Sequence, residues 1–351
     1  MSLEAILEAA VRAPSGDNCQ PWQLSVRGQH IDLLNIPERD TSLFNYRQNA
    51  SMVAHGALIE NVLIASAAEG YRTEVTPFPV AGDPNHVATF YLKEAEIEED
   101  PLSPFIARRQ TNRKRYRPVP LTDEQRESIL KTSNVYPSCM VQLVENEGKD
   151  ILCDIVGAND RIVFENPHLH RFLFDHIRWS SEEAKRSGDG LDIRTLELAL
   201  PDRIGFRLLS HWTAARLLRI LGATRAVAKQ ARDLCSSASA VGLIIADGDG
   251  REDFLSAGRV FQRAWLEATR LGLGFQPMTG ITFLMNRVRA GDCEDLAEDH
   301  RRVVEEASGK LSSLLDLGGK TVAMLFRIGV SDPPSCRSLR YPLENVVQVE
   351  S

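Results

Sequence analysis

The chain has 351 residues, of which 43% are hydrophobic and 25% charged. This length allows two domains or one large domain, and a core of normal size needs no metal or disulfide to stabilise it. The net charge of -7 argues against nucleic acid as the main partner.

The cysteines and the N-terminus indicate a cytoplasmic, soluble protein. Six cysteines are scattered along the chain without a C-x-x-C pair, which is typical of reduced thiols. The first residues contain Glu4 and Glu8 and lack the basic region of a signal peptide. No uninterrupted apolar run approaches the roughly 18 residues that a membrane span needs. We therefore expect neither a membrane nor a nucleic-acid partner.

The first hundred residues predict a mixed helix and strand unit. Helical periodicity covers 3–12, and a hairpin is expected around Arg27 and Gly28. A buried helix over 51–69 ends at Gly70, a suitable helix-terminating glycine. Strands are expected near 72–77 and 86–93. The acidic stretch 94–101 is the linker candidate, which gives domains at 1–100 and 101–351.

The remainder predicts a longer unit. A basic helix is expected near 102–112, and Thr122 with Gln125 has the spacing of a capping box at the start of a helix. The segment 160–232 is rich in helix formers and aromatic residues. The pattern then predicts a strand over 239–247, a helix over 251–271 and a strand over 320–329.

A faint repeat links the two units. Gly56 and Gly70 bracket one apolar helix, and Gly258 and Gly272 bracket another at the same spacing. Similar strands follow, VATFYL and VAMLFR. Chance similarity between two amphipathic helices is the equal alternative.

Four segments carry candidate site chemistry. The loop PSGDNCQPW, residues 14–22, offers short polar groups, although a polar turn beside a buried Trp22 explains it equally well. The run RRQTNRKRYR, residues 108–117, has six basic residues that fit a phosphate, a solvated face or a nucleic-acid patch. Arg337 and Arg340 near the C-terminus could clamp a phosphate or only solubilise the chain end.

The fourth segment, LGLGFQPMTGI at 271–281, is not a dinucleotide fingerprint. Pro277 stands where the third glycine would be required, and the glycines follow a helix instead of a strand. The remaining interpretation is a loop that presents backbone N–H groups to a planar ligand. We find no catalytic triad, phosphate loop or metal motif, and the spacing of His168, His170 and His176 does not match a zinc site.

Together these segments resemble the nitroreductase-like FMN-binding family. PSGDNCQPW resembles its P-S-x-x-N-x-Q-P-W loop, and RRQTNRKRY resembles R-R-S-x-R with Thr111 in place of Ser. QPMTG resembles its P-x-E-G loop, with Thr279 in place of Glu, and RYPLE resembles its C-terminal R-x-P-L-E.

The order of these motifs implies a tandem arrangement similar to the Acg subfamily. The loop lies in the first half and R-x-T-x-R in the second, whereas SNVYPSCMVQLV is a degraded counterpart of the loop. The resemblance implies an α+β fold of two tandem nitroreductase-like copies that form an intramolecular pseudo-dimer. It implies one FMN site, with 160–232 as an inserted lid, and a further homodimer is possible.

The resemblance also assigns roles. Arg109, Arg340 and Arg337 would bind the FMN phosphate, Arg113 would lie near N1 and O2 of the ring, and Thr111 would bond the ring or ribityl chain. Loop 15–18 would contact the far edge of the ring, and the backbone of 278–280 would donate to N5 and O4. The residues implied to bind FMN are Ser15, Gly16, Asn18, Gln20, Arg109, Thr111, Arg113, Pro277, Met278, Thr279, Gly280, Arg337 and Arg340.

No side chain is expected to be catalytic, since the hydride chemistry belongs to the flavin. The implied function is NAD(P)H-dependent two-electron reduction of a small nitroaromatic or quinone. The alternative is an FMN-storing protein whose lid excludes nicotinamide. Aromatic residues of the lid would decide between the two: Phe172, Phe174, Trp179, Phe206 and Trp212.

Overall fold

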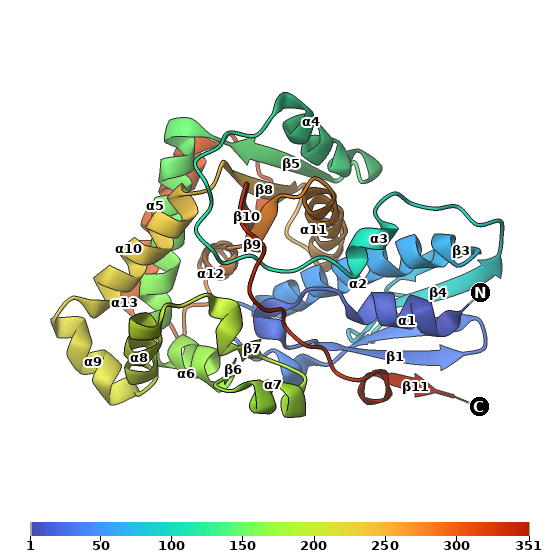
Figure 1. Ribbon diagram of the computed structural model, residues 1–351, viewed down its shortest axis with the longest axis horizontal. Helices are drawn as coiled ribbons and strands as arrows, with labels where there is room; N and C mark the ends of the chain where they lie inside the picture. Colours follow the sequence, from blue (N-terminus) through green and yellow to red (C-terminus); the bar gives the residue numbers. More distant parts are fainter. Residues whose placement is uncertain (1, 351) are drawn as a thin grey trace.

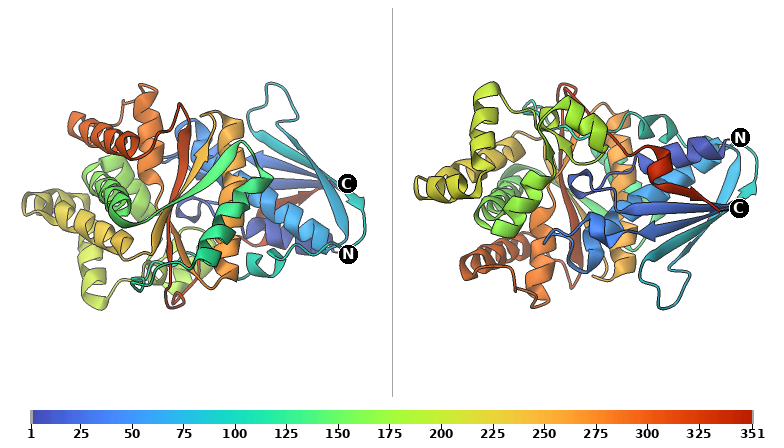
Figure 2. Two further views of the ribbon diagram at one scale, coloured as in Figure 1. Left: turned by 90° about the horizontal axis from the view of Figure 1, so that it is seen from above. Right: turned by 90° about the horizontal axis from the view of Figure 1, so that it is seen from below.

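The computed structural model describes residues 2–350 and contains two main β-sheets on either side of a central helix pair (Figures 1 and 2). The first sheet has the order β11-β1-β2-β4-β3 and the second β5-β8-β10-β9. The strands of the first sheet are β1 (Trp22–Arg27), β2 (His30–Asn35), β3 (Tyr71–Pro77), β4 (His86–Glu94) and β11 (Val347–Val349). Those of the second are β5 (Cys139–Val144), β8 (Ala240–Ala246), β9 (Gly274–Pro277) and β10 (Thr321–Gly329). The fold is therefore α+β, as the sequence predicts.

The two sheets repeat one topology. In each, the first two strands in chain order pair antiparallel, and the fourth lies between the second and third. A 20-residue helix stands between the second and third strands of each set, α2 (Asn49–Ala68) in the first and α11 (Arg251–Arg270) in the second. The repeat suggested by the glycine spacing thus extends to strand order and helix length.

The helices α2 and α11 pack directly against each other through their glycines. A Cβ atom on Gly56 would lie 2.0 Å from the carbonyl oxygen of Leu255, and one on Gly258 would lie 2.1 Å from that of Val53. Any larger side chain at either position would separate the helix backbones. Both helices are buried along most of their length, and their contact connects the two halves of the protein.

Most predicted elements of the first half are confirmed. Helix α1 (Leu3–Val11) buries Ile6 and Ala10, and β1 and β2 form the expected hairpin. Helix α2 is long and apolar enough to cross a membrane by length and composition, which the search for uninterrupted apolar runs missed. However, 83% of that apolar window is buried in the protein, so α2 is a core helix here.

The basic helix predicted near 102–112 is wrong. Only α3 (Ser103–Ile106) is helical, and the chain then runs on without regular structure through Arg113. The amide of Asn112 donates to the carbonyl of Phe275, and the amide of Arg117 to that of Val330. These long-range bonds replace the intrahelical ones, so the basic residues follow the second sheet instead of a helix face.

Between β5 and β8 lies a large helical insertion with no counterpart between β1 and β2. Its elements are α5 (Asn146–Glu165), α6 (Pro167–Asp175), β6 (Ile177–Arg178), α7 (Ser181–Ser187), β7 (Leu191–Asp192), α8 (Leu200–Leu209), α9 (Trp212–Ile220) and α10 (Ala223–Ser236). It includes the predicted insertion 160–232 and adds most of α5. Figure 1 shows it as the green and yellow side of the molecule.

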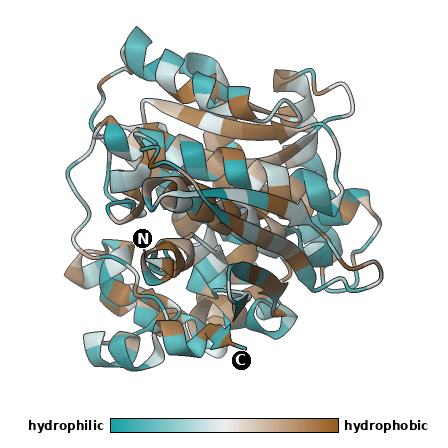
Figure 3. Ribbon diagram, turned by 90° about the vertical axis from the view of Figure 1, so that its right-hand side faces the viewer, coloured by the Kyte–Doolittle hydropathy of each residue, from teal (hydrophilic) through white to brown (hydrophobic). Residues whose placement is uncertain are grey.

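The second half also holds helices outside the insertion. The helix predicted from the capping box at Thr122 is confirmed as α4 (Asp123–Lys131). Helices α12 (Gly280–Arg289) and α13 (Glu298–Leu314) stand between β9 and β10. In Figure 3 the strands are largely hydrophobic, whereas the outer helices mix hydrophobic and hydrophilic residues.

The C-terminal tail returns to the first sheet. After β10 the chain crosses the molecule, and β11 pairs in parallel with β1 through Leu24 and Val347 (Figure 1). The tail therefore crosses the boundary predicted at residues 100 and 101. That crossing brings Arg340 beside α1 and the loop that follows it, and Arg337 to the carbonyl of Ala107.

Candidate functional site

A cavity of about 360 Å³ lies where the two halves meet. Its walls come from loop 14–18, the segment 106–113, residues 276–280, the tail at 336–340, and α5. Twelve of the thirteen predicted site residues line it: Ser15, Gly16, Asn18, Arg109, Thr111, Arg113, Pro277, Met278, Thr279, Gly280, Arg337 and Arg340. Segments up to about three hundred residues apart thus meet at one ligand-sized space.

Gln20 is the exception and lies behind the wall. Its side chain is fully buried, where its Nε2 donates to the carbonyl of Gly188 at 3.0 Å and its Oε1 accepts from the amide of Tyr341 at 2.9 Å. Its polar atoms therefore join loop 14–20 to the insertion and to the tail. It positions the wall and does not face the cavity.

One end of the cavity is strongly positive. Arg12, Arg109, Arg337 and Arg340 all line it, and none of them forms an ion pair with a carboxylate within residues 2–350. Arg109 is only 7% exposed, lies over the ring of Trp265 at 4.2 Å, and donates from Nη2 to the carbonyl of Arg12 at 2.6 Å. Its Nε has no hydrogen-bond partner in the described part of the chain.

Arg109 and Arg340 lie close to the other positive charges of the cluster. Burial lowers the pKa of Arg109, and repulsion from Arg340 and Arg337 lowers it further. Burial likewise lowers the pKa of Arg340 to about 10, with repulsion from Arg12 next in size. Arg340 is fixed by the carbonyl of Ala13 at 2.9 Å and by Oδ1 of Asn18 at 2.7 Å. A cationic cluster in which Arg109 is buried, and which forms no ion pair with a carboxylate of residues 2–350, is suited to an anionic ligand.

The loop after α1 turns sharply into the cavity. Asp17, Asn18 and Gln20 all have left-handed φ values, of 42°, 59° and 52°, a conformation that costs energy for residues other than glycine. The amide of Gln20 donates to Oγ of Ser15 at 2.9 Å, which closes the turn. The Nδ2 of Asn18 donates to the carbonyls of Gly190 at 3.1 Å and Leu339 at 3.0 Å.

The opposite wall is formed where α12 begins beside α5. A Cβ atom on Gly280 would lie 2.4 Å from Oδ1 of Asn159 and 2.9 Å from the ring of Phe44, so only glycine fits without displacing them. That Oδ1 is buried and has no hydrogen-bond partner among residues 2–350. The N–H of Met278 is taken by the carbonyl of Leu325 at 2.7 Å, and that of Thr282 by the carbonyl of Thr279 at 2.9 Å. The amides of Gly280 and Ile281, at the start of α12, come before the first intrahelical bonds and can face a ligand.

Three carboxyl groups also line the cavity, and the sequence analysis missed all of them. Burial raises the pKa of Asp40 to about 6 and that of Asp160 to about 6. Burial also raises the pKa of Asp17, although His176 and Arg113 oppose the shift. Asp17 lies inside the recognised loop motif at a variable position, and Asp40 and Asp160 belong to no motif, so only the fold brings them together.

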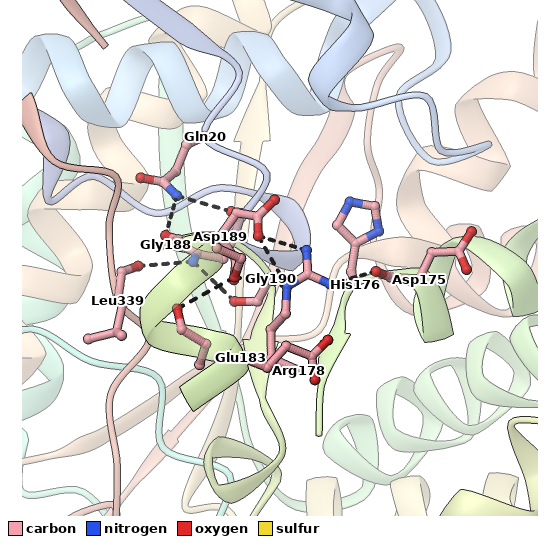
Figure 4. A network of polar contacts seen from close by, with 12 residues as sticks. Gln20, Asp175, His176, Arg178, Glu183, Gly188, Asp189, Gly190 and Leu339 are labelled. Atoms are coloured by element: carbon pink, nitrogen blue, oxygen red, sulfur yellow. Dashed lines mark hydrogen bonds and ion pairs between the residues drawn. The ribbon is translucent and has the colours of Figure 1, made fainter. Parts of the chain in front are cut away.

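The insertion closes one side of the cavity through β7 and the turn after it. Leu191 and Thr195 line the cavity, and the carbonyl of Thr195 accepts from Nη1 of Arg113 at 3.2 Å. Figure 4 shows the polar contacts that hold this side of the insertion in place. Gln20 donates to the carbonyl of Gly188, and Asp189 forms an ion pair with Arg178 at 2.7 Å. In addition, Oη of Tyr341 donates to Asp189 at 3.0 Å.

The five aromatic residues expected to decide access do not line the cavity. Phe174, Trp179 and Phe206 pack on one another, with the rings of Phe174 and Phe206 4.9 Å apart. Trp212 lies 5.0 Å from His170, and Phe172 lies 4.1 Å from His176. These side chains pack within the insertion instead of over the cavity.

The fold and this site define a two-sheet α+β protein with one cationic, ligand-sized cavity between its halves. No family model matches the chain. It is 27% identical over 343 residues to the uncharacterized protein MT1398 of Mycobacterium tuberculosis, an alignment that covers 96% of this chain and 47% of that protein.

Shorter matches point to nitroreductases. The putative NAD(P)H nitroreductase Rv3131 of the same species is 29% identical over 126 residues, 34% of this chain and 36% of that protein. The putative NAD(P)H nitroreductase acg is 26% identical over 95 residues, 27% of this chain and 29% of that protein. These alignments span half or less of each relative. The chain is thus related to the nitroreductase-like proteins, Acg among them.

Solved structures give only a weak superposition. The FMN-dependent nitroreductase NfnB from Mycobacterium smegmatis matches 70% of this chain and 96% of its own, at 14% identity and a TM-score of 0.38.

Proposed function

We propose that the cavity binds one FMN per chain. The observation that carries this proposal is the set of four arginines, at one end of a ligand-sized space, that form no ion pair with a carboxylate of residues 2–350. The free Nε of Arg109 and the free Oδ1 of Asn159 are buried polar atoms that a ligand with a phosphate and a polar ring edge would satisfy. The relatives named as nitroreductases support a flavin as that ligand.

We further propose that the chain is an intramolecular pseudo-dimer with a single composite site. The first half contributes loop 15–18, and the second contributes 109–113, 277–280 and the tail. The repeated sheet topology supports this division, and the boundary at residues 100 and 101 remains our proposal. The six free cysteines agree with a cytoplasmic protein.

The charged and polar groups of the site would contact different parts of FMN. Arg109, Arg337 and Arg340 would hold the phosphate through charge-assisted bonds. Arg113, fixed by the carbonyl of Thr195, would place a positive charge beside the ring. The amides at the start of α12 would donate to the opposite edge of the ring. When bound, FMN supplies the hydride-transfer chemistry, and the protein supplies binding and electrostatics.

The favoured activity is NAD(P)H-dependent two-electron reduction of a small nitroaromatic or quinone, with the nicotinamide as co-substrate. The second candidate is storage of FMN. It is favoured by one observation: the insertion is fastened over the cavity by Asn18, Gln20, Arg113 and Tyr341. A fastened insertion restricts the approach of nicotinamide to the ring.

The test is spectroscopic. The purified protein is analysed for flavin content, and NADPH or NADH is then added without oxygen. About one FMN per chain supports the single site, whereas two or none overturns it. Rapid bleaching by a nicotinamide supports the reductase. Bleaching by dithionite alone supports storage.

A further inference from the structure

The insertion ends in a helical arm with an unusual surface. We define the α8–α9 arm as residues 200–221, which form the part of the molecule furthest from the two termini in Figures 1 and 2. Six of the thirteen large hydrophobic side chains that are exposed within residues 2–350 belong to this arm: Leu200, Ile204, Leu208, Leu217, Ile220 and Leu221. Ile220 is 83% exposed and Leu221 81%.

The exposed side chains follow helical spacing. Leu200, Ile204 and Leu208 recur every four residues along α8, and Leu217, Ile220 and Leu221 recur at three and four residues near the end of α9. Residues at these spacings share one face of a helix. Each helix therefore carries a continuous apolar stripe that faces solvent.

These stripes are not the faces that hold the arm to the protein. Phe206 of α8 packs in the aromatic cluster of the insertion. Trp212 and Ala215 of α9 turn inward, Ala215 being 1% exposed. Each helix thus has one face that is buried against the protein and a second, apolar face that is exposed. Exposed apolar surface of this extent marks an interaction site.

The charge of the arm identifies its partner. The arm contains four arginines and one acidic residue, Asp202, in a chain whose net charge is -7, and a fifth arginine, Arg225, follows it at the start of α10. Arg207, Arg216 and Arg225 are exposed and form no ion pair with a carboxylate within the described chain, whereas Arg219 pairs with Asp299. A helix with an apolar face and a basic polar face is suited to the interface of an anionic membrane.

We propose that the α8–α9 arm docks on the surface of an anionic phospholipid bilayer, with its apolar stripes in the headgroup layer and its arginines on the lipid phosphates. The composition predicts no membrane partner for the chain as a whole, and the arm is the local exception. A second copy of this chain fits less well, because a two-fold contact would place the arginines of one arm near those of the other. This proposal does not depend on the proposed FMN site.

Vesicle cosedimentation of the full chain tests the proposal. Vesicles of equal parts phosphatidylcholine and phosphatidylglycerol are expected to bind the protein, and binding is expected to weaken with salt. Vesicles of phosphatidylcholine alone are expected to bind poorly. The double variant Arg216→Gln, Arg225→Gln is expected to bind about thirtyfold more weakly, since each basic residue near such a surface contributes a factor of about five.

A second double variant, Ile204→Ser with Ile220→Ser, removes one apolar residue from each stripe and is also expected to bind at least about tenfold more weakly. Both positions are exposed, so folding, checked by circular dichroism, is expected to persist. The matched control is Ile97→Ser with Arg302→Gln, which are exposed elsewhere and should leave vesicle binding unchanged.

Absence of binding to the anionic vesicles overturns the proposal, as does equal binding to both vesicle types. A dimer in sedimentation without vesicles that Ile204→Ser with Ile220→Ser dissociates also overturns it, in favour of a second copy on the arm.

Discussion

Gly56 and Gly258 lie against each other at the crossing of α2 and α11, each meeting the carbonyl three residues before the other glycine. This reciprocal contact agrees with the repeated strand order of the two sheets and with the proposed pseudo-dimer. It explains why both helices carry glycine at this position, although glycine weakens an isolated helix.

The contact predicts a large loss of stability on substitution. Gly258→Ala would place a methyl group 2.1 Å from the carbonyl oxygen of Val53, so the helices must separate. We expect the free energy of unfolding to fall by about 1–3 kcal/mol or more, measured by denaturant unfolding. The matched control is Gly309→Ala in α13, where a Cβ meets nothing within 4 Å. Its free energy of unfolding should rise by about 0.5–1 kcal/mol. Equal effects at both positions would contradict the close crossing.

The arginine cluster predicts that affinity depends on the flavin phosphate. Arg109→Met removes a buried guanidinium and keeps an apolar stem over Trp265. We expect FMN binding to weaken by roughly ten- to a hundredfold, since a charged hydrogen bond contributes about 1.5–3 kcal/mol. The affinity for riboflavin, which lacks the phosphate, should fall much less in this variant.

Fluorescence titration of the apoprotein with both flavins measures the difference. The neighbouring Arg108→Met is the control, because Arg108 is exposed and does not line the cavity. An equal loss for FMN and riboflavin would mean that Arg109 does not contact the phosphate.

Buried Asp40 predicts a pH dependence of stability. Its pKa rises from 3.8 to about 6 on folding because of burial. The folded protein therefore holds this proton where the unfolded chain has released it. Asp40 favours folding fully below about pH 4, and that contribution is lost as the pH rises through about 6.

Asp40→Asn is accordingly expected to raise the free energy of unfolding by about 1–3 kcal/mol relative to the natural chain at about pH 7.5, and much less at about pH 4.5. Thermal unfolding of the apoprotein at both pH values checks this. Asp160→Asn repeats the test, since burial raises its pKa similarly. A difference that does not change with pH would refute the assignment.

Weakening a contact that holds the insertion over the cavity is expected to speed the release of FMN. Tyr341→Phe removes the bond from Oη to Asp189 and little else. We expect FMN to dissociate roughly two- to tenfold faster, in line with about 0.5–1.5 kcal/mol for one hydrogen bond, in stopped-flow displacement by riboflavin. Tyr91→Phe on β4, far from the cavity, should leave the rate unchanged. If both variants release FMN at the rate of the natural chain, the contact does not hold the insertion closed.

Much of the site was predictable because its motifs are local. Ser15, Asn18, Arg109 and Gly280 lie in short segments whose turn chemistry and charge are visible in the sequence. Asp40, Asn159 and Asp160 were not predictable, since each belongs to an ordinary loop or helix and reaches the cavity only through packing of distant elements. Gln20 shows the converse: its motif identifies it, but tertiary contacts turn it away from the cavity.

Most periodic elements, the glycine-marked repeat and the loops of the site can be predicted from the chain, because they depend on residues close together in it. Contacts between distant segments place the basic run along a sheet, pack the aromatic residues of the insertion within it, and return β11 to the first sheet. Those outcomes depend on which distant surfaces are available to be buried, and no local pattern specifies that.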